Sequence, residues 1–438
     1  MKSVGSILAA SLGLVALTGA CTDSRIPTEV PVSRTMTPLT ASGRGLLNRY
    51  VAIGTSVTMG VQSDGVFAGS QRDSWAVQLA ALAGHEMSLP LISGYGCGSP
   101  LTSPLVTFGR TRPAPLKEDA ATPFDARQCD PNASDVTLPT ANVAIDGATT
   151  QDALQATSSN KMGLRGQQYA RVLAPGQTQV SAMLAQNPKF VSVELGANDI
   201  MGARNGFYRP GVNVFPLPVW RTLYVQVLDA VERTTKRAIL VGLIDDALEF
   251  PGFRTGGEIW AQQGAFRAAF NVEVDPKCGV EDAGNVLFVP VRVITAVGEG
   301  LKRKQAGPAA GSAKLSCADD PANDPAKPDF VLTPSDIRAI NLHLAEMNAF
   351  IRQQAEARGF AHVELEVIYG RSEAKPAFNV VALMTGQQPY GPYVSLDGIH
   401  PNGAGARILA EAAADALNGH YFLQIGQPVL ADDEDSDE

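Results

Sequence analysis

Residues 49–56 read Arg-Tyr-Val-Ala-Ile-Gly-Thr-Ser, an apolar run that ends in a glycine and two hydroxyl side chains. The β-prone residues from Tyr50 to Ile53 predict a short strand buried on both faces, as in the middle of a parallel sheet. Gly54 lets the backbone turn sharply where this strand ends. The stretch therefore predicts that Ser56 stands at the carboxyl end of the first strand.

The alternation of apolar runs and helical spacing continues along the chain. Further apolar runs that predict strands occur at 142–145, 190–195 and 238–244. Apolar residues recur every three or four positions, as in covering helices, at 74–83, at 222–237, from Thr333 onward and after Gly403. Strands that alternate with helices indicate an α/β fold of the doubly wound type with a mostly parallel sheet.

Two stretches interrupt this alternation, at about 98–140 and 251–329. Both are rich in proline, glycine and polar residues, which is typical of loops. We interpret them as loop-rich insertions on a single α/β body that extends over 44–425. Their aromatic residues, together with Phe250 at one edge, are candidates for an acyl groove, but packing within the insertions is the favoured interpretation: Phe108, Phe124, Trp260 and Phe266.

Composition and charge narrow the class of protein. Of 438 residues, 45% are hydrophobic and 18% are charged, as expected of a globular protein with a large core. The net charge of −9 and the absence of a basic patch argue against nucleic-acid binding. The acidic residues that close the chain predict a disordered tail over 426–438.

The N-terminus carries an export signal. Lys2 precedes an apolar run that is too short to span a bilayer and that ends in Leu17-Thr18-Gly19-Ala20-Cys21. This ending resembles the bacterial lipobox, in which the cysteine is the lipid-modified (palmitate-bearing) first residue, although Leu17 lies one position further from Cys21 than is usual. We expect a signal peptide over 1–20, a lipid at Cys21 and a flexible tether over 21–43. An ordinary secretory signal is the alternative.

Four cysteines remain once Cys21 is assigned to lipid: Cys97, Cys129, Cys278 and Cys317. An even number in an exported protein favours disulfides over a metal site, and no Cys-x-x-Cys is present. Four cysteines allow three pairings, of which the local one, Cys97 with Cys129 and Cys278 with Cys317, closes the shortest loops.

Four short polar motifs stand in a fixed order: Gly54-Thr55-Ser56, Asp146-Gly147-Ala148, Gly196-Ala197-Asn198-Asp199 and Asp397-Gly398-Ile399-His400-Pro401. A serine hydroxyl needs a base to remove its proton, and His400 is the one histidine that follows a carboxylate by three residues, in a loop bounded by glycine and proline. The order of the motifs resembles that of the SGNH, or GDSL, hydrolase superfamily of esterases and lipases.

The resemblance implies a three-layer, flavodoxin-like α/β/α fold and assigns the roles in the site. Ser56 is the nucleophile, His400 the base and Asp397 the carboxylate that orients it. The oxyanion donors are the backbone N–H groups of Ser56 and Gly147 and the side-chain amide of Asn198. Asp199 is expected to brace its loop.

The resemblance also implies a reaction: hydrolysis of carboxylic esters through an acyl-enzyme intermediate, with no metal or organic cofactor. Thr55 departs from the family's usual Gly-Asp-Ser, which raises the question of whether the site turns over. The alternatives are an O-acetyl esterase or acyltransferase acting on surface polysaccharide, and a lipid-tethered binding protein that has lost activity. We expect a monomer that is held by its lipid in the bacterial cell envelope, at the outer membrane or cell surface more than at the inner membrane.

Overall fold

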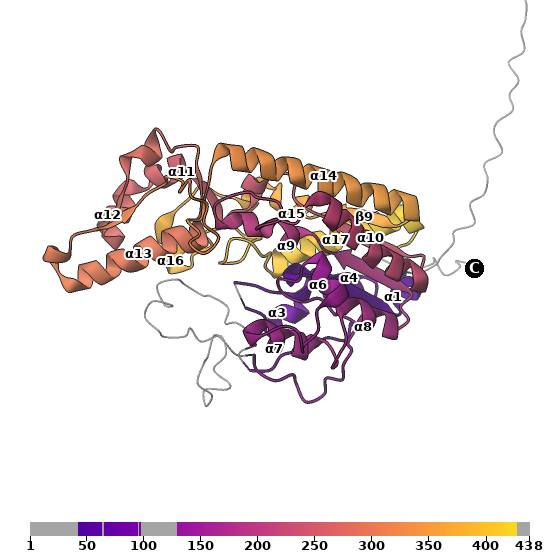
Figure 1. The fold of residues 1–438 in the computed structure, drawn as a ribbon. Helices are drawn as coiled ribbons and strands as arrows, with labels where there is room; N and C mark the ends of the chain where they lie inside the picture. Colours follow the sequence, from indigo (N-terminus) through magenta and orange to yellow (C-terminus); the bar gives the residue numbers. More distant parts are fainter. Residues whose placement is uncertain (1–42, 64, 95, 98–128, 427–438) are drawn as a thin grey trace, which may run out of the picture. The chain divides into compact units, whose positions relative to one another are not determined.

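The computed structural model describes residues 43–426, except 64, 95 and 98–128 (Figure 1). The expected signal peptide, Cys21, the tether, most of the first insertion with Phe108 and Phe124, and the acidic tail lie outside the described residues.

A parallel four-stranded sheet forms the centre of the described chain. Its order is β1-β2-β3-β9. The strands are β1 (Tyr50–Gly54), β2 (Phe190–Glu194), β3 (Ala238–Gly242) and β9 (Ala361–Glu364). Every residue of β1, β2 and β3 is buried, which explains their nearly continuous apolar sequences. The sequence predicted these three strands, but not β9.

The predicted strand at 142–145 runs as an extended segment beside β1. Asn142 forms a parallel bridge with Ala52, and the N–H groups of Val143 and Ile145 donate to Ala52 and Gly54 at 3.0 and 3.1 Å. In chain order, the extended segment at 142–145 comes second and β2 comes third. The segment lies on one side of β1, and β2 lies on the other. This reversal is the switch point of a doubly wound sheet, where ligands bind at the carboxyl ends of the strands.

Helices cover the sheet in two sets. The first set consists of α6 (Thr150–Gln155), α8 (Gln179–Ala185), α10 (Leu217–Thr234) and α14 (Pro334–Arg358). The second consists of α4 (Trp75–Leu82) and α17 (Gly403–Tyr421). Members of each set pack against one another, and α8, α14 and α17 contact β1, β3 and β9 (Figure 1). The arrangement is an α/β fold with helical layers on a parallel sheet, as predicted.

The start of α14 shows how the sequence sets a helix boundary. The Thr333 hydroxyl accepts a hydrogen bond from the Asp336 N–H at 3.2 Å, and the Asp336 carboxylate accepts one from the Thr333 N–H at 3.0 Å. Pro334 occupies the first turn, where its missing N–H costs nothing. The predicted start of this helix is confirmed.

The stretch predicted as the second insertion contains more regular structure than its composition indicated. Its helices are α11 (Gly256–Ala261), α12 (Gln263–Phe270) and α13 (Val289–Ala306), with 3₁₀ turns η4 (Pro276–Gly279) and η5 (Pro308–Ala310). Its strands are β4 (Phe253–Thr255), β5 (Val272–Val274), β6 (Val286–Phe288) and β7 (Ala313–Leu315). Together with β8 (Val331–Leu332), they form the short sheets β4-β6-β8 and β5-β7. Cys278 and Cys317 are joined by a disulfide in this region.

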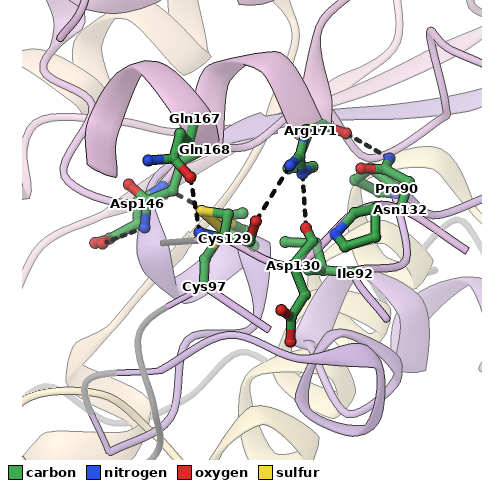
Figure 2. Close-up of a disulfide and its surroundings, with 12 residues drawn as sticks. Pro90, Ile92, Cys97, Cys129, Asp130, Asn132, Asp146, Gln167, Gln168 and Arg171 are labelled. Atoms are coloured by element: carbon green, nitrogen blue, oxygen red, sulfur yellow. Dashed lines mark hydrogen bonds between the residues drawn. A yellow bond between two sulfur atoms is a disulfide. The ribbon is translucent and has the colours of Figure 1, made fainter. Parts of the chain in front are cut away.

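The other disulfide joins Cys97 to Cys129 and is tied to α7 (Gly163–Val172) (Figure 2). The Cys129 N–H donates to the Gln167 side chain at 2.9 Å, and Arg171 donates to the carbonyls of Cys129 and Asp130 at 3.1 and 2.6 Å. The local pairing of the cysteines is therefore the one present.

The remaining elements are short: α1 (Gly43–Leu47), α2 (Ser56–Met59), α3 (Ala68–Arg72), α9 (Ala197–Ile200), η2 (Met201–Asn205), η3 (Ala247–Glu249), α15 (Glu366–Tyr369), η6 (Ser372–Ala374) and α16 (Val380–Thr385). Within the described ranges, no helix combines the length and the apolar character needed to cross a membrane.

Candidate active site

Ser56 lies at the carboxyl end of β1, two residues after Gly54, the last residue of that strand. It is the first residue of α2, a single helical turn, and its side chain is largely buried. The first N–H groups of a helix have no partner within the helix, so the Ser56 N–H is suited to bind a negatively charged atom.

One pocket brings the sequence-predicted residues together. It has a volume of about 180 Å³ and is lined by Ser56, Gly147, Asn198 and His400. These residues follow β1, the extended segment beside it, β2 and β9, so all four come from the same edge of the sheet. The motifs are thus far apart in sequence but adjacent at the switch point, as the fold requires.

Asp397 and His400 form a buried pair beside this pocket. His400 Nδ1 lies 2.8 Å from Asp397 Oδ2, and Asp397 Oδ1 accepts the N–H groups of Ile399 and His400 at 2.9 and 2.8 Å. Burial acts to raise the pKa of Asp397, but the nearby His400 and these hydrogen bonds outweigh it and lower the pKa to about 2. Asp397 is therefore ionised and fixes the orientation of the imidazole, which leaves Nε2 as the ring nitrogen for chemistry.

Two contacts hold the loop that carries this pair. The Tyr369 hydroxyl, which the sequence did not single out, donates to the Ile399 carbonyl, and the Gly252 N–H donates to the Gly398 carbonyl at 2.9 Å. Gly398 has a φ of +70°, and a Cβ there would lie 2.8 Å from the Gly252 Cα. Glycine is required at this position both by the backbone conformation and by the close approach of the neighbouring chain.

Asn198 and Gly147 are fixed by hydrogen bonds that leave N–H groups for a ligand. Asn198 Nδ2 donates to the Ala148 carbonyl at 3.0 Å, and an amide nitrogen carries a second hydrogen. Gly147 has a φ of +64°, and its carbonyl accepts from Arg165 Nη1 at 2.8 Å. This bond orients the Gly147 peptide from the carbonyl side.

Arg165 is a pocket residue that sequence reasoning missed. It lies on α7, its side chain is exposed, and its guanidinium fills the space that a Cβ on Gly147 would take. On the same helix, Gln168 Nε2 donates to Asp146 Oδ2 at 3.2 Å (Figure 2). Because Arg165 lies in a polar helix with no motif around it, only the tertiary structure connects it to the site.

Asp199 braces the loop. Its carboxylate accepts the backbone N–H and the hydroxyl of Thr150, at 3.0 and 2.9 Å. These contacts tie α9 to the start of α6, three residues after Gly147. Burial raises the pKa of Asp199 to about 7, although the bonds from Thr150 act in the opposite direction.

Thr55 has a partner that explains the departure from Gly-Asp-Ser. Its N–H and hydroxyl donate to the carboxylate of Glu194 at 2.9 and 2.8 Å, and the Thr58 hydroxyl donates to the same carboxylate at 3.0 Å. Glu194 is the last residue of β2 and is 1% exposed. The turn that holds Ser56 is therefore anchored to a carboxylate on the adjacent strand. Burial raises the pKa of Glu194, while hydrogen bonds from the N–H groups and hydroxyls of Thr55 and Thr58 lower it.

The candidate acyl-groove aromatics divide between two environments. Phe250 lines the pocket. Phe266 is fully buried against Phe378, with ring centroids 6.4 Å apart, and the Trp260 ring lies against Gly279. Trp260 therefore packs within the insertion and Phe266 packs against a residue outside it, and neither lines the pocket.

No family model matches the sequence, and no curated protein matches it. Three solved structures are similar: LAE5, an α/β hydrolase enzyme from the metagenome of Lake Arreo; a protein described as a GDSL-like lipase from Parabacteroides merdae; and an extracellular lipase from Streptomyces rimosus. Their identities are 12, 11 and 13%, over 84, 85 and 85% of this chain and 93, 95 and 98% of theirs, with TM-scores of 0.32, 0.31 and 0.30. Similarity at this level does not assign a reaction, so the function is inferred from the site.

Proposed function

We propose that this protein is a serine esterase that hydrolyses carboxylic esters, in keeping with the resemblance of its motifs to the SGNH hydrolases. One observation carries the proposal: Ser56, Gly147, Asn198 and His400 line a single pocket, and the ionised Asp397 is bonded to His400 behind it. A buried carboxylate that orients an imidazole beside a serine is the arrangement that activates a hydroxyl nucleophile.

The reaction follows from these positions. Ser56 Oγ attacks the ester carbonyl carbon as its proton passes to His400 Nε2, and the negative charge that develops on the carbonyl oxygen is stabilised by N–H groups of Ser56, Gly147 and Asn198. The C–O bond to the alcohol then breaks, and the alcohol leaves with the proton from His400. Water, deprotonated by His400, attacks the acyl-enzyme and releases the acid and free Ser56.

The test is turnover together with covalent labelling. We expect the 44–438 protein to hydrolyse p-nitrophenyl esters and to be labelled by a fluorophosphonate at Ser56. Ser56→Ala should abolish the labelling and lower kcat by about 10⁴-fold or more. Ser70→Ala, which replaces a buried serine on α3, is the matched control and should keep both signals. Equal signals in Ser56→Ala and the wild type would show that the protein is not a serine hydrolase, and a wild type with neither labelling nor turnover would favour a binding protein.

The same proposal includes attachment to the membrane through a lipid at Cys21, because the sequence before it resembles a lipobox. Metabolic labelling with tritiated palmitate tests this directly. We expect label in the full chain and none in Cys21→Ser, and label retained in Cys21→Ser would contradict attachment at this residue.

A further inference from the structure

A second cavity, enclosed by apolar side chains, lies beside the pocket that holds Ser56. It has a volume of about 40 Å³. Its deep wall includes Leu243 after β3, Ala247 on η3, and Ile340 and Leu344 on α14, all of them buried. Arg204, which is exposed and lies over the ring of Phe288, is the one charged residue among its lining side chains. The cavity therefore suits a hydrocarbon group and offers little to a polar one.

The cavity adjoins the catalytic pocket. Five residues line both spaces: Ala197, Met201, Arg204, Phe250 and Leu365. Leu365 is buried, Ala197, Met201 and Phe250 are partly exposed, and Arg204 is exposed. Ala197 directly precedes Asn198, the candidate oxyanion donor. A carbonyl carbon at Ser56, with its oxygen toward Asn198, thus lies next to a shared boundary on which Arg204 is the one charged residue.

The side chains that line the catalytic pocket differ in polarity, which orients the substrate. Asp146 and the exposed Arg165 line the pocket alone, while Met201, Phe250 and Leu365 line both the pocket and the apolar cavity, together with the exposed Arg204. An apolar acyl chain gains by leaving water for the cavity, whereas an alcohol leaving group has to depart to solvent.

We propose that this apolar cavity is the acyl pocket of the enzyme and that its size selects unbranched acyl chains of short to medium length. The inference rests on the proposed function and adds its substrate class. By the same volume measure a single water needs roughly 10–15 Å³, so the cavity accommodates a narrow chain of a few carbons, and its wall on α14 limits the length.

The experiment compares chain-length profiles. Wild type and variants are assayed for kcat/KM with p-nitrophenyl acetate, hexanoate and decanoate. Because a methylene in an apolar pocket changes kcat/KM by about 10-fold or more, we expect hexanoate to be the best wild-type substrate. Ala247→Leu, which fills the cavity, should lower the hexanoate-to-acetate ratio about tenfold while acetate turnover persists. Ile340→Ala, which deepens it, should raise the decanoate-to-hexanoate ratio about tenfold.

Ile351→Ala is the matched control, because Ile351 is a buried isoleucine of the same helix that does not line the cavity. It should keep the wild-type profile. Ile340→Ala carries the test alone if leucine at 247 prevents folding. Ratios that stay at the wild-type value in the folded cavity variants, with esterase activity intact, would overturn the acyl pocket.

Binding of octanoate to the Ser56→Ala protein, followed by calorimetry, separates this inference from the proposed function. Binding that Ala247→Leu weakens about tenfold supports the cavity even if the wild type hydrolyses no ester. If the wild type hydrolyses esters, but the Ser56→Ala protein does not bind octanoate and the cavity variants keep the wild-type substrate ratios, the acyl pocket is contradicted and the proposed esterase function stands.

Discussion

At the scale of single residues, the hydrogen bonds between Thr55 and Glu194 hold the turn that precedes Ser56. The Thr55 hydroxyl does not cap the helix that begins at Ser56, because it donates to Glu194 on the adjacent strand. The turn before Ser56 is thus held by a hydroxyl donor on Thr55 and a buried carboxyl acceptor on Glu194. Thr55 is therefore compatible with an active site.

Placing an aspartate at position 55, as in a Gly-Asp-Ser motif, should be harmful in this chain. Thr55→Asp removes the hydroxyl that donates to the buried Glu194, at a cost of about 1–3 kcal/mol, and places a second carboxyl group beside it. We expect the free energy of unfolding to fall by about 3 kcal/mol and kcat/KM to fall at least about tenfold. Urea denaturation and ester hydrolysis measure these effects.

Two further variants control this prediction. Thr55→Ser keeps the donor and should resemble the wild type, and Glu194→Gln combined with Thr55→Asp should recover part of the loss. A Thr55→Asp protein as stable and active as the wild type would show that the Thr55 contact to Glu194 is dispensable.

Asp397 allows a prediction about pH. Its pKa is lowered to about 2 in the folded protein, so its stabilising contribution is present above its unfolded value and is lost as the pH falls through about 2. We expect Asp397→Asn to lower kcat by about 10³–10⁴-fold at neutral pH. Its stability deficit relative to the wild type should shrink as the pH falls from 4 toward 2. A deficit that stays constant over this range, measured by urea denaturation, would contradict the ion pair.

At the scale of elements, α7 connects the Cys97–Cys129 disulfide to the pocket. Gln167 and Arg171 hold the chain at Cys129 and Asp130 (Figure 2). Arg165 on the same helix donates to the Gly147 carbonyl. The disulfide is therefore linked through α7 to Gly147, the candidate oxyanion donor.

Removing this disulfide should affect stability and activity together. Its cysteines are 32 residues apart, and closing a loop of that length stabilises a fold by about 3–4 kcal/mol on the chain-entropy account. We expect Cys97→Ala with Cys129→Ala to lose about 3 kcal/mol and to lower kcat under conditions where the protein stays folded. The control is Cys278→Ala with Cys317→Ala, which opens a loop of 39 residues among the short sheets. It should lose similar stability but keep kcat, and equal kcat in both double variants would argue against the link through α7.

The elements also show what the sequence could and could not predict. Strands β1 to β3 and the helices α4, α10, α14 and α17 follow from apolar periodicity and capping, because their burial is continuous or confined to one face. The strand β9 was missed because only alternate residues of its Ala361–Glu364 sequence are buried, which gives too short a pattern. Asp397 and His400 were predictable because they interact locally. Glu194 was not, since its partner Thr55 is 139 residues away and a single glutamate in an apolar strand indicates nothing by itself.

At the scale of the whole molecule, a buried carboxyl group and two histidines have opposite effects on how stability changes with pH. Burial raises the pKa of Asp199 to about 7, so the folded protein holds a proton there that the unfolded chain releases near pH 4. Stability from this group falls as the pH rises through that window. Burial also lowers the pKa of His343 and His362 to about 4, so their contribution to stability rises with pH up to about 6.5. Between about pH 4 and 6.5 the fall from Asp199 therefore offsets part of the rise from the two histidines.

The Asp199→Asn variant separates the contribution of Asp199 to the pH dependence of stability from that of the histidines. Asp199→Asn keeps an oxygen that can accept from Thr150 but never becomes charged, so its stability relative to the wild type should rise with pH. Each pKa unit corresponds to about 1.36 kcal/mol, and the window from pH 5 to about 7 therefore predicts a relative gain of about 2–3 kcal/mol by pH 8. Urea denaturation at pH 5, 6, 7 and 8 measures it. Asp229→Asn, which replaces a half-exposed carboxylate on α10 that pairs with Arg358, is the control and should give a nearly constant difference across these values. If the Asp199→Asn difference is also constant, Asp199 is charged in the folded protein throughout, and its bonds from Thr150 outweigh the effect of burial.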